Sequence, residues 1–149
     1  MNLRPSDEIA VVGAIDPDAT AAGTVTSGWI DASDFEGFYA VVQAGTLGTS
    51  ATVDAKIEQA TDSSGTGAKD VSGSDITQLT QAGTDSDKQA VISLRASALD
   101  VDNSFNYIRL SITVGTATSD VGGLVVGTNP KTAPASDNDA STVDEVVNV

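Results

Sequence analysis

Residues 105–114 of the chain, FNYIRLSITV, alternate between apolar and polar side chains over almost their whole length. A period of two places successive side chains on opposite faces of an extended backbone, so this pattern is typical of a strand that buries one face. The expected buried set is Ile108, Leu110, Ile112 and Val114, and the opposite set is Phe105, Tyr107, Arg109, Ser111 and Thr113.

The same alternation recurs in two other segments, 50–60 and 88–97, whereas helical periodicity is scarce. About eight short segments have strand character, and clusters of Gly, Asp, Ser and Thr separate them. The pattern predicts an all-β fold, an antiparallel β-sandwich that is jelly-roll-like. The segments are 8–15, 22–30, 36–44, 50–60, 75–81, 88–97, 105–114 and 121–127.

The length of 149 residues indicates one domain. We expect an N-terminal arm over 1–8, a β-sandwich over 9–127 and an acidic C-terminal tail over 128–149. Segment 36–44, EGFYAVVQA, is apolar on both faces and predicts a central strand. Residues 61–74 predict a long polar loop. The tail is rich in Pro, Ala, Ser and Asp, so we expect it to be disordered alone and ordered by a neighbouring chain.

The net charge of −14, from 21 acidic and 7 basic residues, limits the classes of partner. The Lys and Arg residues are scattered singly, which argues against binding to nucleic acid or to an anionic membrane. No apolar segment reaches the length of a signal peptide or of a membrane span, so we expect no export by the Sec route.

Catalytic motifs are scarce, because the chain contains neither His nor Cys. The common general base and the thiol nucleophile are therefore missing, and neither Ser-x-x-Lys nor Gly-x-Ser-x-Gly occurs. A pair of carboxylates, as glycosidases use, remains an alternative, although aromatic residues to line a cleft are few. We predict no catalytic residue, no cofactor and no enzyme activity.

Asp100, Asp102 and Asn103 suggest a calcium loop. An EF-hand loop counted from Asp100 requires Gly at its sixth position and Glu at its twelfth, but these positions hold Phe105 and Ser111. The sequence instead predicts a turn before a strand and no dedicated metal site. A weak carboxylate site on the 61–75 or 83–88 loops stays open.

The aromatic residues allow two interpretations. Four of the six lie between 29 and 39, and the others are Phe105 and Tyr107. They could pack as one small cluster at an end of the sandwich. Alternatively, Phe105, Tyr107 and Arg109 form a contact face, because aromatic and Arg side chains are typical anchors of protein interfaces. With the N-terminal arm included, the predicted contact residues are Leu3, Arg4, Phe105, Tyr107 and Arg109.

Three segments resemble a known family: WIDASDFEGFYAVVQAGTLG (29–48), ATVDAKIEQATDSSGTGAKDVSGSDITQLTQ (51–81) and ALDVDNSFNYIRLSITVG (98–115). They are similar to small acidic proteins that tailed phages and prophages encode beside the major capsid gene. Members of that family are regarded as capsid decoration, or cement, proteins. The resemblance covers roughly residues 29–130 and includes no catalytic motif.

The resemblance implies a structural virion protein on the outer surface of a phage capsid, made in the cytoplasm of the bacterial host. Its partner would be the major capsid protein, whose neighbouring subunits it would bridge to stabilise the shell. Closed symmetry makes a homotrimer or another homo-oligomer a reasonable expectation. The alternatives are a tail or head-tail connector component, a carbohydrate-binding adhesive sandwich, and a small hydrolase with two carboxylates.

Overall fold

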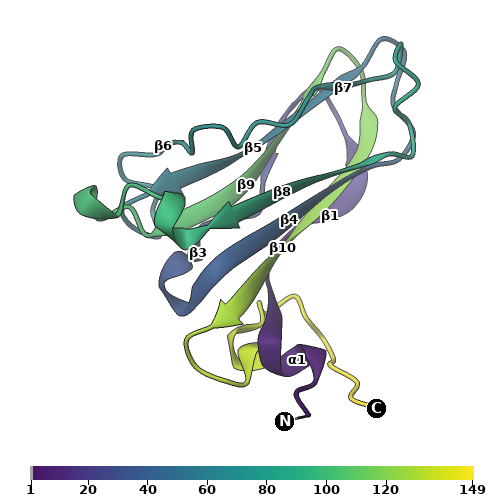
Figure 1. The fold of residues 1–149 in the computed structure, drawn as a ribbon. Helices are drawn as coiled ribbons and strands as arrows, with labels where there is room; N and C mark the ends of the chain where they lie inside the picture. Colours follow the sequence, from purple (N-terminus) through teal and green to yellow (C-terminus); the bar gives the residue numbers. More distant parts are fainter. Residues whose placement is uncertain (1) are drawn as a thin grey trace.

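The computed structural model describes residues 2–149, which form two antiparallel sheets stacked as a sandwich (Figure 1). The four-stranded sheet has the order β1 (Ile9–Thr20), β10 (Ser119–Pro130), β4 (Phe35–Ala44) and β8 (Gln89–Arg95). In the six-stranded sheet β9 (Tyr107–Gly115) pairs with β5 (Thr52–Ala60). The short strands β2 (Gly23–Thr26) and β3 (Ile30–Asp31) pair with β9, and β6 (Lys69–Asp70) and β7 (Leu79–Thr80) pair with β5.

The strand order is that of a jelly roll. β2 and β3 follow each other along one edge of β9, and β6 and β7 do so along β5, so ten strands occupy eight positions. The first position pairs with the eighth, the second with the seventh, the third with the sixth and the fourth with the fifth. Such nested pairing is what a long antiparallel ribbon gives when it rolls up into two sheets. The predicted jelly-roll-like sandwich is confirmed.

The core lies between the two sheets and is made largely of Ala, Val, Leu and Ile. The alternation predicted for 50–60 and 105–114 is confirmed, since the apolar set of each strand is buried. Phe35 and Phe38 are also buried, with ring centres 6.0 Å apart in an edge-to-face arrangement. Phe35 packs against Gly127, where a Cβ atom would approach the ring to 2.7 Å.

Strand β4 lies inside its sheet, between β10 and β8, as the sequence predicted. Only one of its faces is fully buried, however. Tyr39 is 45% exposed and Val41 is half-buried, because both lie on the outer face of the sandwich, opposite Ala40 and Val42. The outer face of this central strand therefore presents an aromatic and an aliphatic side chain to its surroundings.

The arm and the tail lie together beyond one end of the four-stranded sheet, and both chain ends are at the bottom of Figure 1. The arm contains the short helix α1 (Pro5–Glu8), and the tail contains the 3-10 turn η4 (Ala135–Asn138). The first residue of the predicted arm lies outside the described residues. Strand β10 continues to Pro130, so the sandwich includes residues 128–130.

The tail is held by its own chain. Ala135 is fully buried, and Val11 on the outer edge of β1 bonds to two tail residues: its N–H donates to Asp139 Oδ1 and its carbonyl accepts from the Ala140 N–H, both at 2.8 Å. The sequence led us to expect that a neighbouring chain would order the tail, but contacts within the chain itself hold this part of it. Among the described residues, no helix combines the length and apolar character needed to cross a membrane.

Candidate interaction surface

Arg109, one of the predicted contact residues, is held by two neighbours on the outer face of the six-stranded sheet. It lies opposite Glu58 in the β5–β9 pairing, and its Nε donates to Glu58 Oε2 at 2.6 Å. Its guanidinium carbon lies 4.4 Å from the centre of the Trp29 ring, within range of a cation–π interaction. The Arg109 side chain is therefore oriented by its own chain before any partner arrives.

The charged row continues across β5 towards the edge of the same sheet. Lys56 Nζ lies 2.7 Å from Asp70 Oδ1 and 3.9 Å from Glu58 Oε1. The hydrogen bond to Asp70 is the largest cause that raises the pKa of Lys56 above its ordinary value, so Lys56 stays charged. Four side chains of alternating sign, Arg109, Glu58, Lys56 and Asp70, thus form a continuous network across the face.

Phe105 stands beside this network, above the turn that precedes β9. Lys69 Nζ lies 4.0 Å from the centre of the Phe105 ring and also donates to Asp100 Oδ2. This hydrogen bond is the main cause that holds the pKa of the Asp100 carboxyl below its ordinary value. The two aromatic residues Trp29 and Phe105 therefore each carry a cation over the ring.

The segment that suggested a calcium loop is a turn. Residues Val101–Asn103 form the 3-10 turn η3, which ends at Ser104 in the left-handed conformation. Both Asp100 carboxylate oxygens accept from Asn103 Nδ2, at 2.8 and 3.0 Å, in addition to Lys69. The predicted turn before a strand is confirmed. In the described part of the chain, no group of three acidic, His or Cys residues is placed to hold a metal ion.

The polar loop predicted over 61–74 packs against the two rings. Asp62 Oδ1 accepts from the N–H groups of Ser64 and Thr66, at 2.9 and 3.0 Å, and the hydrogen bonds from Thr66 lower the pKa of Asp62. A Cβ atom on Gly65 would lie 2.5 Å from Trp29 Nε1, so only glycine fits there. Trp29 is thus half-buried, with the Arg109 guanidinium over its ring and Gly65 against its ring nitrogen.

The six aromatic residues do not form one cluster, so that interpretation was wrong. Phe35 and Phe38 belong to the core, Trp29 lies under Arg109 on the outer face of the six-stranded sheet, Phe105 lies under Lys69 before β9, and Tyr39 is exposed on the opposite sheet. The inward or outward position of each residue along its strand determines this separation. The sequence allowed both interpretations because it does not show which strands are neighbours.

The structure places Tyr107 and Arg109 on one face of β9, whereas Phe105 lies before β9 beside Lys69, and Leu3 and Arg4 lie in the arm. Tyr107 is half-buried and lies opposite Ala60 and Asp31 in the sheet. Leu3 is 48% exposed at the start of the arm, and the Arg4 N–H donates to Asp7 Oδ2 at 2.8 Å. The five predicted contact residues thus do not form a single site.

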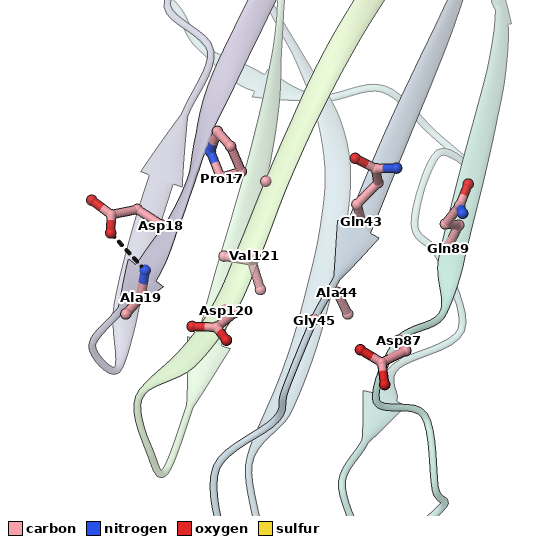
Figure 2. A pocket seen from close by; sticks show the side chains of 11 residues that line it. Pro17, Asp18, Ala19, Gln43, Ala44, Gly45, Asp87, Gln89, Asp120 and Val121 are labelled. Carbon is pink, nitrogen blue, oxygen red and sulfur yellow. Dashed lines mark hydrogen bonds between the residues drawn. The ribbon is translucent and has the colours of Figure 1, made fainter.

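A further groove, not expected from the sequence, lies on the outer face of the four-stranded sheet (Figure 2). It crosses the ends of all four strands and is lined by carboxylates and amides. The groove is open and has no aromatic side chain, so it offers no stacking platform. Its polar lining residues are Asp18, Gln43, Asp87, Gln89 and Asp120.

Next to this groove, an apolar row crosses the same face. Leu124 of β10 pairs with Val41 of β4, which pairs with Val91 of the edge strand β8. Val91 is 45% exposed. We call Leu124, Val41 and Val91 the outer apolar row. Outer faces of antiparallel sheets are commonly polar, so this row is a second candidate contact site.

No protein-family model matches the chain. No curated protein matches it either. Among solved structures it is similar to infectious bursal disease virus, Gx strain, with a TM-score of 0.46, 14% identity, and 91% of this chain aligned to 39% of that one. For Triatoma virus the TM-score is 0.46 at 8% identity, with 91% of this chain aligned to 72% of that one. For Broad Bean Stain Virus the TM-score is 0.44 at 11% identity, with 89% of this chain aligned to 92% of that one. The chain spans 39% of the length of the first of these proteins.

Proposed function

We propose that the chain is a decoration protein of a tailed-phage capsid. It would sit on the outer surface of the shell and bridge neighbouring major capsid subunits, adding stability without chemistry. One observation carries the proposal: the segments that resemble decoration proteins, 51–81 and 98–115, supply most of one surface. They contribute Lys56, Glu58, Asp70, Tyr107 and Arg109 to the outer face of the six-stranded sheet.

This face is suited to binding because its long side chains are already oriented. Arg109 is held by Glu58 and Trp29, and Lys56 is held by Asp70. Long charged side chains normally lose rotamer freedom when they bind, at roughly 0.5–1.5 kcal/mol each. Side chains that the fold has already ordered avoid much of that cost, so the contact can be tight over a modest area.

Charge and mass action fit the same role. A net charge of −14 keeps the protein off the packaged nucleic acid and in solution until it meets the shell. A protein that binds the assembled shell and not its free subunits shifts the equilibrium towards the shell. Stabilisation therefore requires only a binding surface that spans two subunits.

The test is co-sedimentation of the protein with undecorated shells of the phage that encodes it, followed by heating of the decorated shells. We expect saturable binding and a higher disruption temperature. Tyr107→Ala should weaken binding about tenfold, as expected for an interface anchor. Tyr39→Ala is the matched control, because Tyr39 is exposed on the other sheet. Equal binding by both variants would refute the choice of face.

A protein that ignores shells but is found on tails would be a connector component, and one that binds glycans would be an adhesive module. Deletion of 131–149 tests the tail in the same assay. If the tail contacts a neighbouring subunit, shells should be incompletely occupied by the truncated protein. Full decoration by the truncated protein would remove the tail from the contact.

A further inference from the structure

The two edges of the four-stranded sheet differ in whether their outward backbone groups are hydrogen-bonded. At the β1 edge, the N–H and carbonyl of Val11 are both bonded to the tail, through Asp139 and Ala140. At the other edge, β8 pairs only with β4. An edge strand with free backbone groups is a template for another strand, and most proteins protect such edges.

The pairing of β8 with β4 shows which of its backbone groups are free. The Ala44 N–H donates to the Lys88 carbonyl at 2.9 Å, so this pair is a hydrogen-bonded one. Hydrogen-bonded and non-bonded pairs alternate in an antiparallel ladder, so the backbone groups of Gln89, Val91 and Ser93 turn away from β4. No hydrogen bond reaches these groups from residues 2–149.

This edge also exposes an apolar side chain. The outer apolar row ends at the edge with Val91, which is 45% exposed. A groove runs beside β8, between residues 92–95 of the strand and residues 71–74, which follow β6. An incoming strand would find both unpaired backbone groups and an apolar side chain to cover.

We propose that β8 pairs in antiparallel fashion with β8 of a second copy of the chain, centred on Val91. The sequence DKQAVISLR, 87–95, is self-complementary in this register. Val91 meets Val91 of the second copy and Gln89 lies opposite Ser93. Arg95 lies opposite Asp87 of the second copy, twice in the pair.

Charge complementarity favours the second copy as the occupant. In the described part of the chain neither Asp87 nor Arg95 takes part in an ion pair. Asp87 lines the outer-face groove beside Gln89 (Figure 2), and Arg95 lines another outer-face groove beside Ser93. Arg95 ends β8, and Asp87 lies in the turn just before β8, where its N–H donates to the Gly45 carbonyl at 3.0 Å. The two charges thus stand near opposite ends of the strand on the outer face, which is the placement that antiparallel self-pairing requires.

The pair would have twofold symmetry, with about six backbone hydrogen bonds from the outward residues of the two strands. The four-stranded sheets of the two copies would form one continuous sheet, and their outer apolar rows would join into one apolar stripe across it. This assembly is a dimer, whereas the sequence led us to expect a homotrimer or another homo-oligomer. It does not depend on capsid binding, because neither the strand nor the register involves the other sheet.

The test is sedimentation equilibrium of the full chain from about 1 µM to about 1 mM, in about 0.3 M NaCl to screen the repulsion between two acidic copies. We expect a reversible monomer–dimer equilibrium. Asp87→Lys or Arg95→Glu should each weaken the dimer roughly tenfold, because each replaces two attractions by two repulsions. The double variant, Asp87→Lys with Arg95→Glu, should restore the dimer.

Lys131→Glu is the matched control for Arg95→Glu, since it changes net charge equally at a site outside β8. We expect it to leave the dimer unchanged, and thermal melts to show that every variant is folded. A monomer over the whole concentration range, a trimer, or a double variant no tighter than the single ones would each overturn the proposal. No shell is present in the assay, so its failure would leave the capsid-binding proposal untouched.

Discussion

Replacing Arg109 by Ala should lower the stability of the protein without unfolding it. The change removes the 2.6 Å contact between Nε and Glu58 and the cation over the Trp29 ring. The two charged side chains are 28% and 17% exposed, so solvent screens the pair only in part. An ion pair near the surface contributes about 0.2–1 kcal/mol and an exposed cation–π contact about 0.5–1 kcal/mol.

Together these contacts give an expected loss of about 1–2 kcal/mol in the free energy of unfolding. For a chain of this length each kcal/mol shifts Tm by about 2–4 °C, so we expect a fall of roughly 2–8 °C. Lys56 remains 3.9 Å from Glu58, which limits the cost of leaving that carboxylate without Arg109. The measurement is thermal unfolding followed by circular dichroism.

A double-mutant cycle separates the two contacts. Arg109→Ala combined with Glu58→Gln should lose less than the sum of the single changes, and so should Arg109→Ala combined with Trp29→Leu. Arg109→Lys keeps the charge but loses the Nε hydrogen bond, so its Tm should fall between those of the native protein and Arg109→Ala. An unchanged Tm for Arg109→Ala, or no coupling in either cycle, would refute the internal network.

Three further predictions concern the same surface and the tail. Asp100→Asn should destabilise the protein near neutral pH but not in strong acid. Hydrogen bonds, chiefly from Lys69, hold the pKa of Asp100 in the folded protein below its ordinary value of 3.8. The stability that the Asp100 carboxylate contributes is therefore complete above about pH 4 and is lost as the pH falls through the folded pKa. Urea titrations at several pH values test this, and equal destabilisation at all pH values would contradict it. Gly65→Ala should cost about 1–2 kcal/mol and shift Trp29 fluorescence, because φ is +83° and a Cβ atom would lie 2.5 Å from the ring nitrogen; an unchanged emission spectrum would argue against the contact. Deleting 131–149 should lower Tm and speed amide exchange in β1, read by mass spectrometry, while unchanged exchange would show that the tail does not protect that edge.

Strand identity was the most predictable part of the fold. In 50–60, 88–97 and 105–114 the period of two is strong, and the predicted inward set of each strand is largely buried. Strand number also came close to the structure, since the ten strands fill eight positions. The boundaries of β1 and β10 were less predictable, because both strands extend beyond their apolar segments, to Thr20 and Pro130.

The candidate site was predictable only in part. The outward placement of Tyr107 and Arg109 follows from alternation within one strand, whereas Phe105 lies before β9. Their surroundings do not, because Trp29 precedes β3 and Lys69 opens β6, both far away along the chain. The outer apolar row was missed for a related reason: each of its members stands on a different strand.

By itself, the sequence determined the class of fold, the strands, the sign of the surface charge and the turn before β9. Each of these depends on residues that are close together along the chain, where alternation, turn propensity and charge act locally. Only the tertiary structure decided that Arg109 is stacked on Trp29, that the tail closes the β1 edge and that the β8 edge stays open. These features depend on strand order and register, which arise when distant segments pack their buried faces together, and a local pattern does not specify which strands become neighbours.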